Sequence, residues 1–184
     1  MSVSTNEKNT GGIPSAVLPD INIGADPLSS LIPGLEPLRP QKICFVCTGN
    51  TCRSPMAAAV LNHLGSRYGF TGVSAGIYPN VGEPIAENAV KALKAAGIEP
   101  SPGNEYTSHT ACRVSAELLS GCDKIIGISG SHTLTLLALF PQYASRITAF
   151  NEDIADPWGG SEEIYDECLK QITEGIRAMF GLYD

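Results

Sequence analysis

The sequence lacks the features that mark membrane-spanning and nucleic-acid-binding proteins. Its 184 residues contain no apolar run approaching the ~20 residues that a transmembrane helix needs. Positive charge is scarce, because 12 Lys and Arg stand against 19 Asp and Glu, which gives a net charge of −7. This balance argues against nucleic acid or an anionic membrane as the main partner. The N-terminus shows no basic region followed by an apolar one, so we expect no secretory signal and a cytoplasmic protein.

Charged residues make up only 17% of the chain and hydrophobic residues 43%, a composition typical of a globular protein. The length allows one domain with a sizeable core. Six cysteines are present, at positions 44, 47, 52, 112, 122 and 168. Because no export signal precedes them, we expect reduced thiols rather than disulfides.

The chain divides into two regions that differ in composition and in hydrophobic pattern. Residues 1–40 hold six of the 13 prolines, no aromatic residue and no helical or strand period. They are predicted to form a Pro-rich N-terminal extension or linker. Their scattered apolar residues leave a second interpretation open, an arm that docks on the domain or on a partner. Residues 41–184 are predicted to form the catalytic domain.

Short apolar runs alternate with helical patterns across residues 41–184. The runs are 42–47, 72–76, 124–129 and 146–150, and the helical patterns are 55–64, 84–96, 131–140 and 161–179. Ser54 is the expected N-cap of the first helix, with Pro55 at its first position. This alternation predicts a three-layer α/β fold, a four-stranded parallel sheet with helices on both faces. Ligands bind such sheets at the carboxyl ends of the strands.

The loop after the first strand has the composition of an anion site. It comprises Cys47, Thr48, Gly49, Asn50, Thr51, Cys52, Arg53 and Ser54, between a buried strand and a helix N-terminus. Such a loop can turn its backbone N–H groups inward around a phosphate. Gly49 and Asn50 tolerate the positive φ that a tight turn requires. The guanidinium of Arg53 can clamp two oxygens of the anion at once.

Cys47 is the candidate nucleophile of this loop. The helix dipole, the inward N–H groups and the guanidinium all favour its thiolate, and Ser54 can donate a further hydrogen bond. A thiolate beneath a bound phosphate is placed for in-line attack on phosphorus. The competing interpretation is a buried cysteine beside a capping turn.

No metal or cofactor is expected. Cys44 and Cys47 have Cys-x-x-Cys spacing, but residues three apart on a strand point to opposite faces. The same geometry prevents Cys44, Cys47 and Cys52 from holding one metal ion together.

A proton donor for the leaving group is expected at the same edge of the sheet. Asp156 follows the fourth strand by six residues, and Pro157 stiffens its loop. Asp156 is therefore the candidate general acid.

Three segments together resemble the low-molecular-weight protein tyrosine phosphatase family. They are the loop from Cys47 to Ser54, the sequence Ser-Ala-Gly at 74–76, and Asp-Pro at 156–157. The resemblance covers residues 41–184 and implies a flavodoxin-like fold, a phosphocysteine intermediate, no metal and phosphorylated proteins as substrates. It assigns Cys47 as nucleophile, Arg53 as phosphate clamp and Asp156 as acid and then base. Asn50 and Ser54 would hold the loop and the thiolate.

Within that family, the chain is similar to a bacterial branch that dephosphorylates arginine. The run from Val46 to Met56 matches that branch, including Thr51, where tyrosine-specific relatives usually have an aliphatic residue. The branch also has Asp-Pro-Phe-Gly-Gly, which here reads Asp-Pro-Trp-Gly-Gly with Trp158 as the aromatic wall. The resemblance thus implies hydrolysis of phosphoarginine, with Thr51 and Trp158 setting selectivity. Phosphotyrosine is the alternative substrate.

Cysteines and histidines outside these roles leave further alternatives open. Cys52 is a candidate redox partner that could protect Cys47 as a reversible disulfide. An arsenate reductase of the same fold would need two more cysteines after the third strand, whereas Cys112 and Cys122 flank a predicted helix. A non-catalytic phosphoprotein-binding module is the alternative of another class. His63 and His132 are interpreted as solvated or capping residues, and His109 receives no role.

Overall fold

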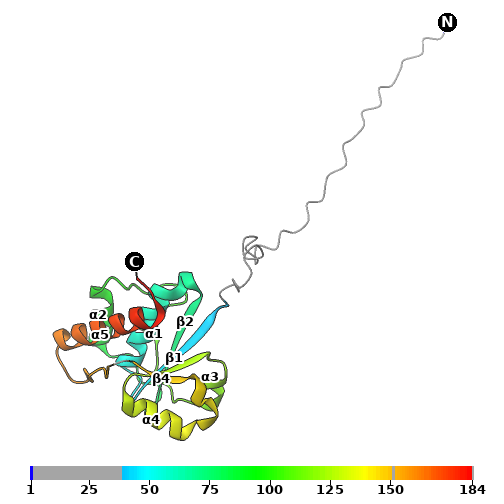
Figure 1. Cartoon of the computed structure of the whole chain (residues 1–184). Helices are drawn as coiled ribbons and strands as arrows, with labels where there is room; N and C mark the ends of the chain where they lie inside the picture. Colours follow the sequence, from blue (N-terminus) through cyan, green and yellow to red (C-terminus); the bar gives the residue numbers. More distant parts are fainter. Residues whose placement is uncertain (2–38, 151, 184) are drawn as a thin grey trace. The chain divides into compact units, whose positions relative to one another are not determined.

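The computed structural model describes residues 1, 39–150 and 152–183. Within residues 39–150 and 152–183, four parallel strands form one sheet in the order β2-β1-β3-β4. The strands are β1 (Gln41–Cys47), β2 (Phe70–Gly76), β3 (Lys124–Gly127) and β4 (Ile147–Ala149). The helices are α1 (Arg53–Gly65), α2 (Glu87–Ala95), α3 (Ala116–Ser120), α4 (Gly130–Leu139) and α5 (Glu162–Phe180). They lie on both faces of the sheet (Figure 1), which confirms the predicted three-layer α/β fold.

Strand β1 divides the core into two clusters because alternate side chains point to opposite faces. Ile43, Phe45 and Cys47 pack with α1, α2 and α5. Cys44 and Val46 pack on the other side, with α3 and α4. The prediction that Cys44 and Cys47 point to opposite faces is therefore confirmed.

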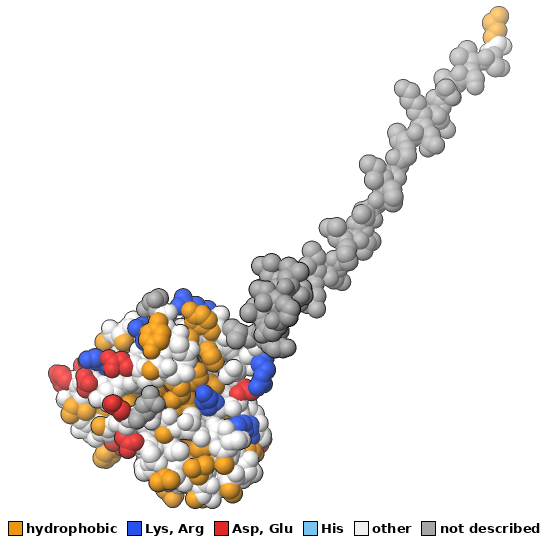
Figure 2. Space-filling view, viewed as in Figure 1, with side chains coloured by type: hydrophobic (Ala, Val, Ile, Leu, Met, Phe, Trp, Pro, Cys, Tyr) orange, Lys and Arg blue, Asp and Glu red, His pale blue; other side chains and the backbone are white. Residues whose placement is uncertain are grey.

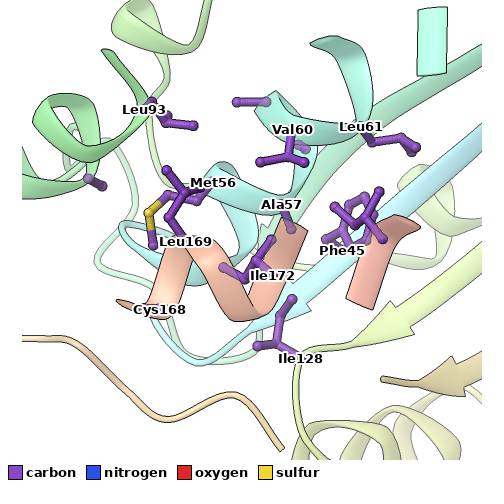
Figure 3. Close-up of a cluster of buried hydrophobic side chains, with 14 of the residues drawn as sticks. Phe45, Met56, Ala57, Val60, Leu61, Leu93, Ile128, Cys168, Leu169 and Ile172 are labelled. Carbon is purple, nitrogen blue, oxygen red and sulfur yellow. The ribbon is translucent and has the colours of Figure 1, made fainter. Parts of the chain in front are cut away.

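The larger cluster fixes α1 against the sheet (Figure 3). Met56, Ala57 and Val60 of α1 meet Leu169 and Ile172 of α5, all of them buried. Each fully buried aliphatic side chain of this kind contributes about 1.5–3 kcal/mol to stability. This packing fixes the N-terminus of α1, and with it the loop that precedes the helix.

Glycine at position 72 allows α1 to lie close to β2. A Cβ atom there would stand 2.8 Å from the carbonyl oxygen of Ala58. The second strand is longer than predicted, because it begins at Phe70 instead of Gly72.

Two helices differ from the sequence prediction. The helix expected over residues 84–96 is shorter, since Pro84 forms an extended bridge with Thr110 and the amide of Ala86 bonds to Thr51 O at 2.9 Å. It ends as expected before Gly97, which has a left-handed φ of 76°. Helix α3 is the short helix expected between Cys112 and Cys122; its bounds were not predicted, because five residues are too few to show a helical period.

The predicted extension over residues 1–40 lies almost wholly outside the described residues. In the described ranges, no helix is long and apolar enough to cross a membrane. On the face shown in Figure 2, acidic side chains gather where α5 begins. Glu162 and Glu163 lie in its first turn, where carboxylates complement the helix dipole.

Candidate active site

The loop between β1 and α1 turns tightly around the carboxyl end of an inner strand. Asn50 makes the turn with a left-handed φ of 58°. Of the two residues predicted to tolerate a positive φ, Asn50 adopts one and Gly49 does not, so one left-handed residue completes the turn. The amides of Gly49, Thr51 and Cys52 donate to no acceptor in the described part of the chain. They are free to bind an anion as a nest.

The thiol of Cys47 lies at the base of this loop, with the residue only 2% exposed. The backbone N–H of Asn50 donates to its Sγ at 3.3 Å, and the hydroxyl of Ser54 lies 3.0 Å from the same atom. Both contacts stabilise a thiolate at this position. The hydroxyl of Ser54 thus lies within hydrogen-bonding distance of the thiol, and its supporting role stays a prediction.

Ser54 is not the N-cap of α1, contrary to the sequence prediction. The helix begins two residues earlier than predicted, at Arg53 instead of Pro55, and its N-cap residue Cys52 makes no capping hydrogen bond through its side chain. The hydroxyl of Ser54 is used elsewhere, because Sγ of Cys47 at 3.0 Å and Ala75 O at 3.3 Å are the two acceptors within reach of its one proton.

Asn50 connects the loop to three neighbouring segments and is fully buried. Its Nδ2 donates to Ser54 Oγ and to Ser74 Oγ, both at 2.9 Å. Its Oδ1 accepts the N–H of Cys112 at 2.9 Å, and its carbonyl oxygen accepts Nε2–H of His109 at 2.8 Å. Because all these hydrogen bonds are made, Asn50 holds the strained turn in one conformation.

Gly76, at the end of β2, allows the loop to approach this closely. A Cβ atom at position 76 would lie 2.8 Å from Thr48 O and 3.0 Å from the Cβ of Asn50. The Ser-Ala-Gly sequence at 74–76 therefore supplies a hydroxyl for Asn50 and space for the loop.

Arg53 and Asp156 face each other across the site. Nη2 of Arg53 lies 2.6 Å from Oδ2 of Asp156, and Nη1 donates to Ile154 O at 3.3 Å. The buried Nε has no hydrogen-bond partner among the described residues. A buried donor of this kind suits an anion bound over the loop. The Asp156 side chain is 51% exposed, so it can reach a substrate.

His132 is buried beside the loop, so the interpretation as a solvated residue is wrong. Its Nε2 lies 3.0 Å from Thr48 Oγ1, and its Nδ1 lies 2.7 Å from Ser129 Oγ, the N-cap residue of α4. Burial lowers the pKa of His132, and the positive charge of Arg53 lowers it further. A neutral imidazole therefore connects the start of α4 to the phosphate-binding loop.

Cys52 lies on the α5 side of the loop. Its Sγ is 3.2 Å from Tyr165 Oη and 3.6 Å from Thr51 Oγ1. Burial raises the pKa of the Cys52 thiol, so it is protonated at neutral pH. Cys47 and Cys52 thus have different surroundings within one loop.

Residues 47–53 and Asp156 line a cavity of about 300 Å³ over the loop. Its walls add Tyr78, Asn80, Glu83 and Trp158, of which Tyr78 and Trp158 are 68% and 76% exposed. A larger groove of about 480 Å³ lies between α2 and α5, but no cysteine is among the described residues that line it. The smaller cavity is the candidate active site, because a buried thiol, a guanidinium and a carboxylate all line it.

The model of the low molecular weight phosphotyrosine protein phosphatase family matches residues 42–182. The chain belongs to this family. A protein-arginine-phosphatase of Bacillus subtilis is 30% identical over 146 residues, covering 74% of this chain and 93% of that protein. A probable low molecular weight protein-tyrosine-phosphatase of Ralstonia nicotianae is 32% identical over 142 residues, covering 75% and 92%.

The solved structure of an arginine phosphatase from Geobacillus stearothermophilus superposes with a TM-score of 0.68 at 30% identity, covering 76% of this chain and 90% of that one. Relatives of both substrate types therefore match this low molecular weight phosphatase. The resemblance seen in the sequence is confirmed, and the chain is a protein phosphatase, a hydrolase.

Of the remaining cysteines of the phosphatase, Cys168 packs in the same cluster as the Cys47 side chain, whereas Cys44 and Cys122 lie on the other face of the sheet. Cys122 packs with Cys44 in the cluster on the other face of the sheet. Cys112 is exposed, and its thiol faces Ser74 O at 3.5 Å. The two flank α3 as predicted, and the β3–α4 turn contains no cysteine.

Proposed function

We propose that this phosphatase hydrolyses phosphoarginine in cytoplasmic proteins through a phosphocysteine intermediate. Cys47 attacks phosphorus, and the P–N bond breaks as Asp156 gives a proton to the departing guanidino nitrogen. The Asp156 carboxylate then takes a proton from water, which attacks the phosphocysteine and releases inorganic phosphate and the Cys47 thiolate. Arg53 and the loop amides neutralise the charge of the equatorial phosphoryl oxygens.

The observation that carries the arginine assignment is the hydroxyl side chain of Thr51 in the wall of the catalytic cavity. Its Oγ1 lies 3.6 Å from Cys52 Sγ, and its carbonyl oxygen accepts the N–H of Ala86, which fixes the residue. A hydroxyl beside the phosphate can bond to a polar leaving group or a water, which an aliphatic side chain cannot do.

Phosphotyrosine is the second candidate substrate, and the exposed aromatic walls favour it. Tyr78 and Trp158 border the same cavity and could enclose a phenyl ring. The same walls can stack on a planar guanidinium, so the aromatic residues alone do not select one substrate.

One experiment separates the two substrates. We would measure kcat/KM on one peptide that carries either phosphoarginine or phosphotyrosine at the same position, with Cys47→Ser as the blank. We expect a preference for phosphoarginine of about a hundredfold, which corresponds to about 2.7 kcal/mol. Thr51→Ile should reduce this preference, whereas Thr107→Ile, the same change at an exposed site outside the cavity, should leave it intact.

The other outcomes are equally informative. A preference for phosphotyrosine would contradict the arginine assignment and leave Cys47, Arg53 and Asp156 in their roles. Turnover by Cys47→Ser would contradict the mechanism. Phosphate binding without turnover by the unmodified protein would indicate a binding module, and thiol-dependent reduction of arsenate would indicate a reductase.

A further inference from the structure

Carboxylates outnumber cationic side chains among the described residues that line the catalytic cavity. Among the described residues, Arg53 is the one Lys or Arg side chain that lines it, and Asp156 and Glu83 also line it. Asp156 already pairs with Arg53. Glu83 forms no salt bridge within the described part of the chain. The wall therefore carries one carboxylate without a cationic partner.

The backbone holds Glu83 firmly in the wall. Its N–H donates to Asn80 O at 3.1 Å, and its carbonyl oxygen accepts the N–H of Ala111 at 2.7 Å. Gly82, with a left-handed φ of 90°, donates to Ala111 O at 2.8 Å. Two segments far apart in the sequence thus fix the backbone of this turn, which carries the exposed Glu83 side chain at the cavity wall.

A carboxylate at this place discriminates between leaving groups by charge. Phosphotyrosine has no positive charge, so its phosphate would be repelled by Glu83. A phosphorylated guanidinium keeps a positive charge next to the phosphoryl group, and its N–H donors match a carboxylate. The unpaired carboxylate is therefore complementary to one of the two candidate substrates.

We propose that Glu83 is a specificity-determining residue that binds the guanidinium of a phosphoarginine side chain and disfavours phosphotyrosine. This inference rests on the proposed function. The leaving guanidino nitrogen receives a proton from Asp156 as the P–N bond breaks, so the group is cationic before and after cleavage. Glu83 therefore stabilises the bound substrate and the transition state alike, and its effect falls on KM rather than on kcat.

The test compares Glu83→Gln with the unmodified enzyme on the matched phosphoarginine and phosphotyrosine peptides. We expect KM for the phosphoarginine peptide to rise about tenfold with kcat nearly unchanged, because a charge-assisted hydrogen bond is lost. We expect kcat/KM for the phosphotyrosine peptide to rise about twofold to threefold, because repulsion is removed. Glu83→Lys should shift the preference further in the same direction. Glu99→Gln makes the same change of net charge at an exposed position outside the cavity, and should leave KM and kcat unchanged for both peptides.

The outcomes separate this inference from the proposed function. If the unmodified enzyme prefers phosphoarginine and Glu83→Gln changes kcat/KM for both peptides by the same factor, the role proposed for Glu83 is wrong and the proposed function stands. If Glu83→Gln lowers kcat for both peptides with KM unchanged, its role is structural and the inference is likewise overturned. If the unmodified enzyme does not cleave phosphoarginine, the inference and the proposed function both fail.

Discussion

Arg53 and Asp156 are joined by an ion pair of 2.6 Å between Nη2 and Oδ2, across the mouth of the phosphate-binding loop. The guanidinium thus has two anionic partners available, the carboxylate of the protein and the phosphate of a substrate. A dianionic phosphate competes for the same N–H donors. When the phosphate takes them, the half-exposed carboxylate is released toward the leaving group. In the proposed mechanism, this one contact links substrate binding to the placement of Asp156 as general acid.

Replacing Asp156 with Asn tests its role as general acid. We expect kcat for a phosphorylated peptide to fall about 10²–10³-fold, because the leaving group loses its proton donor. The loss should be much smaller for p-nitrophenyl phosphate, whose leaving group departs with little protonation. Asp153→Asn is the matched control, because that carboxylate accepts the N–H of Gly130 at 2.7 Å instead of facing Arg53. An equal loss of kcat for both substrates would contradict the role.

Replacing Asn50 with Ala tests the conformation of the loop. The change removes the side-chain bonds to Ser54, Ser74 and the Cys112 amide, and puts an alanine at φ 58°. We expect a loss of about 2–4 kcal/mol in the free energy of unfolding and a fall in kcat of at least tenfold, measured by urea denaturation and by steady-state kinetics.

Asn62→Ala is the control for this variant. Asn62 makes two hydrogen bonds to the backbone of Gly72, away from the thiol. It should lower stability and keep kcat. If the two variants lose kcat equally, Asn50 has no special role in the loop.

The sequence was sufficient to bring Cys47, Arg53 and Asp156 to one site, because the carboxyl ends of parallel strands share one edge of a sheet. The contacts of His109 and His132 could not be predicted. Both histidines come from loops and helix starts whose orientation depends on the packing of the whole domain. The capping prediction for Ser54 failed for a related reason, since local propensity favours a cap whereas the nearby thiol offers another partner for the hydroxyl. Glu83 follows the Ser-Ala-Gly sequence by seven residues. This spacing alone does not indicate a functional residue, because only the structure shows that Glu83 lines the cavity.

Stability should depend on pH through His132. Burial and the charge of Arg53 lower its folded-state pKa, against about 6.5 in an unfolded chain, while Asp156 and Asp153 act weakly in the opposite direction. Below about pH 6.5 the unfolded state therefore binds more protons, and stability falls as the pH falls toward the folded-state pKa. We expect the urea midpoint to drop between pH 7.5 and 5.5, and to drop less in His132→Gln. His63→Gln, at an exposed position, should keep the full drop. An equal drop in His132→Gln would contradict this assignment.

The two thiols of the loop predict reversible inactivation by hydrogen peroxide. The peroxide oxidises the Cys47 thiolate to a sulfenic acid, and the Cys52 thiol then condenses with it, which forms a disulfide and releases water. Dithiothreitol should restore most of the activity of the unmodified enzyme, and mass spectrometry should detect the Cys47–Cys52 bond. In Cys52→Ser the sulfenic acid has no partner in the loop and proceeds to the sulfinic acid, so we expect little recovery relative to the untreated variant. Cys168→Ser is the control, because burial raises the pKa of that thiol to about 12 and its Sγ faces Ala155 O. Full recovery of Cys52→Ser would show that Cys52 does not protect Cys47.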